Sequence, residues 1–328
     1  MPRRLFTLAL AALAPLSSAA LAQTSTTTLQ AVSGPDKVDR TTQTEDVRFR
    51  TDRNSRMTVP VLLSGTGPYR FLVDTGANRT ALSRTLAARL NLPPGDRVEV
   101  HSAVGVTTVD TATVPSLQLT RKDVKIVDAP LLEDVNIGAD GVLGVDSLRS
   151  QRVMFDFDKQ TMSIVPSATP DFRAEPGTIV VQARRRNGRL LLTEASANGH
   201  SIVVVIDTGS EVSVGNEALR RQLLGSKLLK GTDQVQLETV TGEKLFGDYM
   251  FVRELEVGGF GLNNLAVVFA DAHVFKELKL DDRPALLLGM NAMRAFKKVS
   301  IDFAAKTLRV IVPEHSQLDW RMALAGGI

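Results

Sequence analysis

The sequence contains no cysteine and only four histidines, which are His101, His200, His273 and His315. Without cysteine the chain forms no disulfide bond and offers no cysteine for a lipid anchor, so its stability depends on its apolar core. The histidines are widely scattered and lack the spacing of metal ligands. The sequence therefore predicts neither a metal site nor a cofactor.

Aromatic residues and net charge are also low. Aromatic residues make up 5% of the 328 positions, and 39 basic residues against 36 acidic ones leave a formal charge of +3. Few side chains are left to stack on bases, and the charge gives no support to a nucleic-acid partner. The hydrophobic share of 43% is ordinary for a folded protein, and the length allows two domains with separate cores.

The N-terminus has the three parts of a secretory signal peptide. Met1–Arg4 is positively charged, Leu5–Leu16 is apolar, and Ala20–Ala22 fits an A-x-A cleavage site. We expect residues 1–22 to be removed during export, leaving a periplasmic or secreted chain without an integral membrane anchor. An uncleaved N-terminal anchor is the alternative, although the apolar stretch is short for a membrane span.

The remaining chain divides into two lobes joined by a short connection. Residues 23–55 are rich in Thr, Ser, Gln, Asp and Arg and poor in large apolar side chains, which is typical of a flexible linker. That linker could also act as a pro-segment. We expect a first lobe at 56–167, a connection at 168–177, a second lobe at 178–313 and a C-terminal tail at 314–328.

One short motif occurs twice. Phe71–Ser83 and Val203–Val214 each contain an apolar run followed by Asp-Thr-Gly. Each run predicts a strand buried on both faces, and the motif then turns the chain and leaves one carboxylate at the strand end. These carboxylates belong to Asp74 and Asp207. A single Asp-Thr-Gly is weak evidence, but two copies in the same context indicate that the two strand ends meet.

The two halves of the chain also close alike. Val142-Leu143-Gly144 and Leu287-Leu288-Gly289 each predict the end of a strand, followed by a short helix and a hairpin. A repeat of this length is well above the periods of solenoid proteins and indicates a duplicated domain.

Two carboxylates at the ends of symmetry-related strands cannot both stay ionised at hydrogen-bonding distance. They share one proton and titrate as a pair. The ionised member can take a proton from a bound water while the protonated member donates to a carbonyl oxygen. This chemistry hydrolyses an amide without a covalent enzyme intermediate. The sequence does not distinguish the two members.

On these motifs, over residues 57–312, the chain resembles the aspartic peptidases, and specifically a retropepsin-like domain duplicated in tandem. The resemblance implies a mostly β fold with two pseudo-symmetric closed β-barrel lobes and a few short helices. It also implies a peptide or protein substrate, and a monomer whose dyad forms in cis.

The resemblance assigns roles to individual residues. Asp74 and Asp207 would be the catalytic dyad, supported by the active-site loop residues Thr75, Gly76, Thr208, Gly209 and Ser210. Gly144 and Gly289 would lie in the segments that thread behind these loops. Val104 and Gly105, with Thr241 and Gly242, would form glycine-containing flaps over the substrate, because neither Tyr69 nor Tyr249 falls at a predicted hairpin tip.

Three alternatives remain open to the sequence. An exported peptide-binding or scaffold protein could retain Asp-Thr-Gly as a tight turn without catalysis. Each half could also pair with the half of another chain and form two sites per dimer, although the short connection favours pairing in cis. A serine hydrolase is disfavoured, since no G-x-S-x-G motif is present and no histidine has an evident serine partner.

Overall fold

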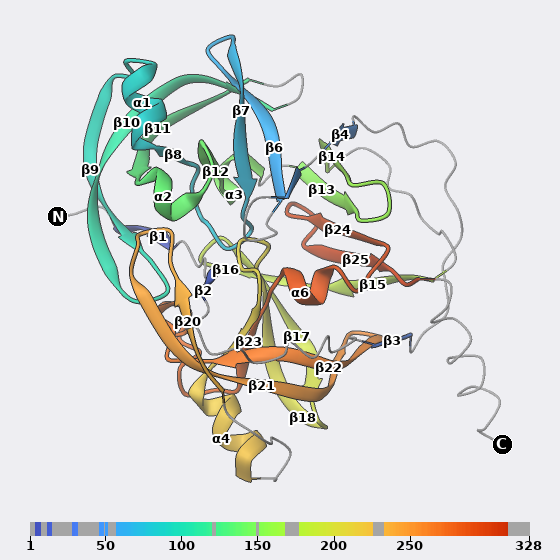
Figure 1. Cartoon of the computed structure of the whole chain (residues 1–328). Helices are drawn as coiled ribbons and strands as arrows, with labels where there is room; N and C mark the ends of the chain where they lie inside the picture. Colours follow the sequence, from blue (N-terminus) through green and yellow to red (C-terminus); the bar gives the residue numbers. More distant parts are fainter. Residues whose placement is uncertain are drawn as a thin grey trace.

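The computed structural model describes residues 4–7, 12–14, 28–31, 46–48, 50–51, 57–119, 123–148, 151–167, 177–225 and 233–313. Before residue 57 it describes the backbone of short strands. The described chain is mostly β, with six short helices, and forms two lobes (Figure 1). These features confirm the predicted β class and the two-lobe arrangement.

The first lobe carries two long hairpins and three short helices. Its elements are β6 (Met57–Leu63), β7 (Thr66–Val73), β8 (Ala81–Ser83), α1 (Arg84–Arg89), β9 (Pro94–His101), β10 (Val106–Gln118), β11 (Asp123–Leu132), α2 (Asp134–Ile137), β12 (Gly141–Leu143), α3 (Val145–Leu148), β13 (Gln151–Asp156) and β14 (Thr161–Pro166).

The second lobe repeats this order after two additional strands. Its elements are β15 (Thr178–Gln182), β16 (Arg184–Arg186), β17 (Arg189–Ala197), β18 (His200–Ile206), β19 (Ser213–Gly215), α4 (Glu217–Gly225), β20 (Asp233–Glu238), β21 (Lys244–Val257), β22 (Phe260–Phe269), α5 (His273–Glu277), β23 (Ala285–Leu288), α6 (Met290–Met293), β24 (Lys298–Asp302) and β25 (Thr307–Ile311).

In both lobes the strand before the motif lies beside the strand that closes the half. Phe71–Val73 of β7 pairs in parallel with β12, and β18 pairs in parallel with β23. Each lobe sheet also pairs back on itself, through β10 with β6 in the first lobe and β17 with β21 in the second. Both motif strands end in three buried residues, so side chains pack on both faces there as predicted.

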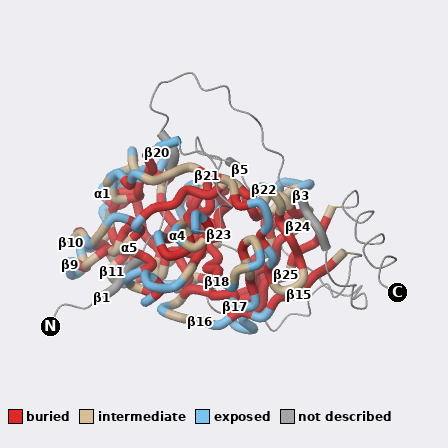
Figure 2. Tube along the Cα trace, turned by 90° about the horizontal axis from the view of Figure 1, so that it is seen from below, coloured by how far each residue is buried: buried red, intermediate tan, exposed pale blue. Residues whose placement is uncertain are grey.

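A third sheet joins the lobes. Its strand order is β15-β25-β24-β13-β14-β4, so the closing hairpins of the two halves lie side by side, with β13 antiparallel to β24. The largest apolar cluster accordingly includes residues of both lobes, among them Phe71, Phe155, Phe260 and Phe303. Figure 2 shows buried positions running through the strands, with exposed ones mainly at turns and edges.

Five short strands lie in the N-terminal region. They are β1 (Arg4–Thr7), β2 (Ala12–Ala14), β3 (Thr28–Ala31), β4 (Asp46–Arg48) and β5 (Arg50–Thr51), and they pair with β9, β20, β22, β14 and β6 respectively. Three of them fall in the predicted linker. The remainder of the predicted signal peptide and linker, most of the connection and the predicted tail lie outside the described residues.

One predicted hairpin has a different partner. The Asn187-Gly188 dipeptide is a strong hairpin signal, and the apolar runs on its two sides, Thr178–Val181 and Leu190–Leu192, predict the paired strands. The turn joins β16 to β17 instead. The apolar strand β15 pairs with β25 in the shared sheet, where its alternate side chains are buried. The arginines of β16 are exposed or half-buried beside the turn, as expected for a charged run. Among the described residues, no helix is both long and apolar enough to cross a membrane.

Candidate active site

The two motif aspartates come together at the centre of the molecule. Asp74 follows β7 and Asp207 follows β18, and both side chains are fully buried. Each backbone amide is held by the closing strand of its own lobe, since Asp74 N donates to Leu143 O at 3.0 Å and Asp207 N donates to Leu288 O at 3.1 Å. The same local pairing therefore positions both carboxylates.

Each carboxylate accepts hydrogen bonds from its own loop. Asp74 Oδ1 accepts from Gly76 N at 2.7 Å and from Ala77 N at 3.0 Å, and Asp207 Oδ1 accepts from Gly209 N at 3.0 Å. These bonds fix one oxygen of each group and aim the loops' amide dipoles at it.

The remaining oxygen of each carboxylate, Oδ2, is called the outer oxygen below, and the two outer oxygens differ in their hydrogen bonding. Asp207 Oδ2 accepts a hydrogen bond from the Ser210 hydroxyl at 3.0 Å. Ala77 takes the equivalent position in the first lobe, and Asp74 Oδ2 is buried without a hydrogen-bond partner among the described residues. The pair is therefore chemically asymmetric although its backbone is repeated.

The two motif threonines join the loops reciprocally. The Thr75 hydroxyl donates to Ile206 O at 3.1 Å, and the Thr208 hydroxyl donates to Val73 O at 2.8 Å. Each hydroxyl also accepts from the other threonine's backbone amide at 3.0 Å. Four buried hydrogen bonds thus connect the lobes directly beneath the carboxylates.

The motif glycines leave room for the opposite carboxylate. A Cβ on Gly76 would lie 2.5 Å from Asp207 Oδ1, and a Cβ on Gly209 would lie 2.3 Å from Asp74 Cγ. Neither position can hold a side chain without a shift of the dyad. The requirement for glycine therefore comes from the neighbouring lobe.

The closing segments support both loops from behind. A Cβ on Gly144 would lie 2.3 Å from Arg79 C, and one on Gly289 would lie 2.7 Å from Val212 C. Beyond these glycines, Val145 N donates to Ala77 O and Met290 N donates to Ser210 O, each at 2.8 Å. The segments thus pass close enough to bond the loops through the backbone.

Sequence reasoning missed a polar pair behind each loop. Asp146 Oδ1 accepts from the amide and hydroxyl of Thr80 at 2.8 Å, and Asn291 Oδ1 accepts from the amide and hydroxyl of Ser213 at 2.9 and 2.8 Å. Burial raises the pKa of Asp146. Both acceptors stand two residues after the closing glycine, so the repeat itself carried a signal for them.

Burial dominates the electrostatics of the dyad. It raises the pKa of Asp74 well above its ordinary value, and the charge of Asp207 raises it further. Burial also raises the pKa of Asp207 to about 6, against the opposing charge of Arg189 and the hydrogen bond from Ser210. The pair therefore retains a proton well above the usual range of an aspartate.

The candidate flap residues lie at the tips of two hairpins. Val104 and Gly105 lie between β9 and β10, and Thr241 and Gly242 lie between β20 and β21. Figure 1 draws both hairpins extending from their lobes on the same side of the molecule. Val104 is 40% exposed, and a Cβ on Gly105 would meet nothing within 4 Å. Gly242 instead has a φ of +84° and packs against Asn136.

The first flap contacts the second lobe at several points. Glu243 accepts hydrogen bonds from the Ser102 hydroxyl and, at 3.4 Å, from the Thr107 hydroxyl. His101 Nδ1 lies 3.0 Å from His273 Nε2, and His273 N donates to Ala103 O at 2.7 Å. His101 is therefore not an isolated surface histidine, but part of a contact between the lobes.

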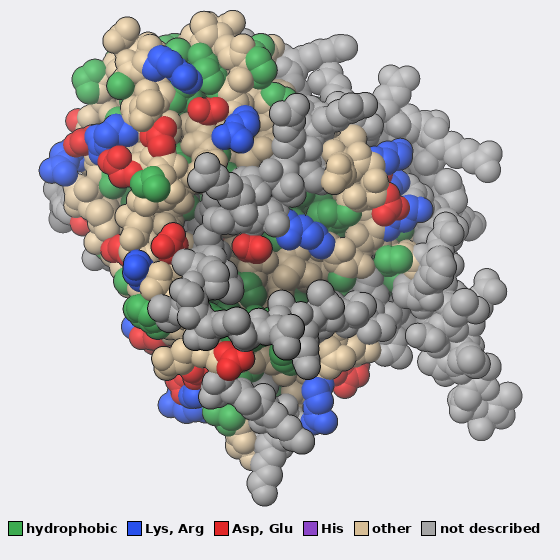
Figure 3. All heavy atoms as spheres, in the orientation of Figure 1, with side chains coloured by type: hydrophobic (Ala, Val, Ile, Leu, Met, Phe, Trp, Pro, Cys, Tyr) green, Lys and Arg blue, Asp and Glu red, His purple; other side chains and the backbone are tan. Residues whose placement is uncertain are grey.

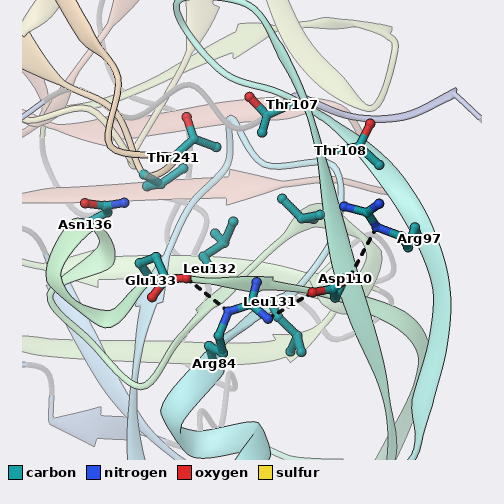
Figure 4. Close-up of a pocket in the computed structure, with 12 residues that line it drawn as sticks. Arg84, Arg97, Thr107, Thr108, Asp110, Leu131, Leu132, Glu133, Asn136 and Thr241 are labelled. Atoms are coloured by element: carbon teal, nitrogen blue, oxygen red, sulfur yellow. Dashed lines mark hydrogen bonds and ion pairs between the residues drawn. The ribbon is translucent and has the colours of Figure 1, made fainter.

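A polar pocket lies between the first lobe and the tip of the second flap (Figure 4). It encloses about 240 Å³, and Val240 and Thr241 form part of its wall. Arg84 pairs with Asp110 and Glu133 there, each at 3.0 Å. Arg97 also pairs with Asp110, at 3.2 Å, so two cations balance two carboxylates. This balance agrees with the mixed basic and acidic surface of this lobe in Figure 3. The pocket does not include the dyad.

No group of three or more potential metal-ligating side chains occurs among the described residues.

Comparison with protein families matches each lobe separately. Residues 59–150 match the family described as "gag-polyprotein putative aspartyl protease", and residues 193–292 match the family described as "aspartyl protease". Each match includes one Asp-Thr-Gly motif and one closing segment. None of the curated proteins compared with the chain matches it.

Proposed function

Because the chain belongs to the aspartyl proteases, with two domains of these families in tandem, we propose that it is an exported endopeptidase with one active site. Asp74 and Asp207 form the catalytic dyad within a single chain. The observation that carries the proposal is the reciprocal hydrogen bonding of Thr75 and Thr208, which holds two buried carboxylates at one point between the lobes.

The asymmetry of the dyad supports distinct roles for its members. Asp207 is the ionised member, because the Ser210 hydroxyl donates to its outer oxygen and so stabilises the negative charge. Asp74 carries the proton, because its outer oxygen is buried without a partner among the described residues and its pKa is raised by burial.

Hydrolysis then proceeds by direct attack of water. The water oxygen bonds to the peptide carbon while Asp207 takes a proton from the water. At the same time Asp74 donates its proton to the carbonyl oxygen. The resulting diol collapses when the C–N bond breaks. Asp207 passes its proton to the leaving nitrogen, and a diol hydroxyl returns a proton to Asp74, so both carboxyl groups end as they began.

An extended peptide fits between the lobes, with its backbone bonded to the flaps. Val104 and Val106 on the first flap are 40% and 46% exposed, and Phe246 on the second flap strand is 58% exposed. These side chains favour apolar residues in the substrate. Since both aspartates are fully buried, the hairpins must open before a substrate can enter.

Export is proposed from the sequence of residues 1–22, which has the charge, apolar stretch and cleavage site of a signal peptide. The product would act in the periplasm or outside the cell.

The proposal is tested by incubating the mature chain with a mixed peptide library from acidic to neutral pH. We expect cleavage within peptides, and its loss in both Asp74→Asn and Asp207→Asn. Asp281→Asn, which changes an exposed carboxylate, is the matched control and should cleave like the wild type.

Full activity of either dyad variant would exclude a shared dyad. Failure of the wild type to cleave any peptide, together with saturable peptide binding, would instead favour the noncatalytic peptide-binding module.

A further inference from the structure

A wholly buried arginine lies in the second lobe. Arg189 is the largest fully buried side chain of the described residues, with 0% exposure, and its Nη1 lies 3.1 Å from Glu277 Oε2 in α5. A buried cation is costly unless it is paired, and removing one partner leaves an uncompensated charge. The pair is thus a specific feature of this interior.

The position of Arg189 in the sheet brings it to the dyad. In the β17–β18 ladder Leu191 is opposite Val205, and continuing that register by two residues places Arg189 opposite Asp207. Residues directly opposite in an antiparallel pair share one face of the sheet. Arg189 therefore lies on the same face as the catalytic carboxylate.

The turn before Arg189 touches both the other lobe and α5. Asn187 Nδ2 donates to Glu277 O at 3.2 Å. A Cβ on Gly188, whose φ is +83°, would lie 2.4 Å from Oδ1 of Asn78, four residues after Asp74 in the first catalytic loop. The turn is wedged between α5 and this loop, so Arg189 has little freedom to move away.

The positive charge of Arg189 acts on both carboxylates of the dyad, and other charged groups lie around it. Arg189 lowers the pKa of both Asp74 and Asp207, opposing the effect of burial. Glu277 pairs with Arg189, and its negative charge also raises the pKa of His273, which lies in the same helix. The pKa of His273 is also affected by three other groups, which are Lys276, Asp271 and, from the first flap, His101.

We propose that Arg189, oriented by Glu277, is a positioning residue that stabilises the singly ionised form of the dyad. This inference rests on the proposed function, since that form of the dyad activates water. The role assigned to Arg189 is electrostatic. It acts through space on the carboxylates, and Glu277 limits how strongly it acts.

The test compares two substitutions of opposite electrostatic sign in the mature chain. Arg189→Met keeps a long side chain but removes the positive charge, so the bell-shaped pH profile of kcat/KM should move to higher pH by about 1 unit. Glu277→Gln keeps an acceptor for Arg189 but removes the negative charge, so the profile should move to lower pH. Arg184→Met, on exposed β16, is the matched control and should leave the profile unchanged.

Two further measurements keep the test decisive. Arg189→Lys preserves the charge and should keep the wild-type profile. If Arg189→Met does not fold, the test compares Arg189→Lys with Glu277→Gln, which should still move the profile to lower pH. Titration of the aspartate carboxyl carbons by 13C NMR reports the dyad without activity. If the wild type cleaves nothing but its dyad still titrates at higher pH in Arg189→Met, the inference stands and the proposed function fails.

Two results would overturn the inference. One is an unchanged dyad titration in Arg189→Met. The other is a shift of the same sign in Arg189→Met and Glu277→Gln, because loss of packing rather than loss of charge would then explain both.

Discussion

Ser210 and Ala77 occupy equivalent places in the two Asp-Thr-Gly loops, yet only the serine has a side chain that can donate a hydrogen bond to its aspartate. Asp74 Oδ2 is left buried without a partner among the described residues, whereas Asp207 Oδ2 accepts from the Ser210 hydroxyl at 3.0 Å. One hydroxyl group therefore breaks the symmetry of a duplicated backbone. In the proposed mechanism, this difference assigns the acid to Asp74 and the base to Asp207.

Burial of Asp207 makes the stability of the protein depend on pH. Its folded pKa of about 6 lies above the ordinary 3.8, so its contribution to stability is fully present below about pH 4 and is lost as pH rises through about 6. Asp207→Asn removes the ionisation. We expect it to be more stable than the wild type at pH 7 by about 2 to 3 kcal/mol, and about equally stable at pH 3.5.

Urea unfolding at both pH values measures this difference, with Asp281→Asn as the control. Equal effects of Asp207→Asn at pH 3.5 and pH 7 would contradict the raised pKa.

Glycine is required at Gly76 but not at Gly105. Gly76→Ala would place its Cβ 2.5 Å from Asp207 Oδ1, whereas Gly105→Ala would meet nothing within 4 Å. We expect Gly76→Ala to lose activity and about 1 to 3 kcal/mol of stability, as in an overpacked core. Gly105→Ala, which adds a methyl group in open space on the candidate flap, should match the wild type in stability. Thermal unfolding and peptide cleavage measure both effects, and an active, stable Gly76→Ala would refute the interlocked geometry.

At the scale of elements, the first flap is held by contacts with the second lobe. Glu243 accepts from Ser102 and Thr107, while His273 contacts His101 and Ala103. These contacts come from two different elements, the second flap and α5. The closed state of the hairpin is thus set by the opposite lobe.

Loss of Glu243 should loosen the first flap. Hydrogen bonds to a charged group are worth about 1.5 to 3 kcal/mol, so Glu243→Ala should speed hydrogen exchange of the amides at 102–105 by about tenfold or more. Glu238→Ala, which removes an exposed carboxylate from the same hairpin, is the matched control. Unchanged exchange in Glu243→Ala would show that other contacts hold the flap.

Sequence reasoning found the elements whose signal is local. Apolar runs ending in Asp-Thr-Gly predicted both strands that carry the motif aspartates. A serine before a short helical stretch is another local signal, and Ser83 at the start of α1 accepts from Leu86 N as a helix cap. The partner of a strand carries no such signal. The Asn187-Gly188 turn is evident in the sequence, but either β15 or β16 could pair with β17 across it. β15 instead pairs with β25, which lies more than 100 residues later in the sequence, and is buried there.

The contacts between the lobes were the least predictable. Arginine is rarely buried, so nothing in the pattern around Arg189 distinguished it from the exposed arginines of β16. His101 looked isolated because its partner, His273, lies 172 residues away in the sequence. These features depend on how the two lobes dock, which periodicity and turn chemistry do not specify.

At the scale of the molecule, the proposed active site takes one aspartate from each half of a single chain. We therefore expect the specific activity to stay constant as the protein is diluted, because no association step is needed. Sedimentation of the active species should give the mass of one chain. A specific activity that falls on dilution toward zero would indicate that the halves pair between chains.

The sheet shared by the lobes makes the backbone connection between them dispensable for their association. β13 and β24 pair through Arg152–Asp156 and Lys298–Asp302, and the threonine exchange adds a second set of bonds across the same boundary. A chain cut between residues 168 and 176 should thus remain one particle, and two separately expressed halves should reassemble into a split enzyme. The second half alone would expose the edge of β24 and would need its partner to stay in solution.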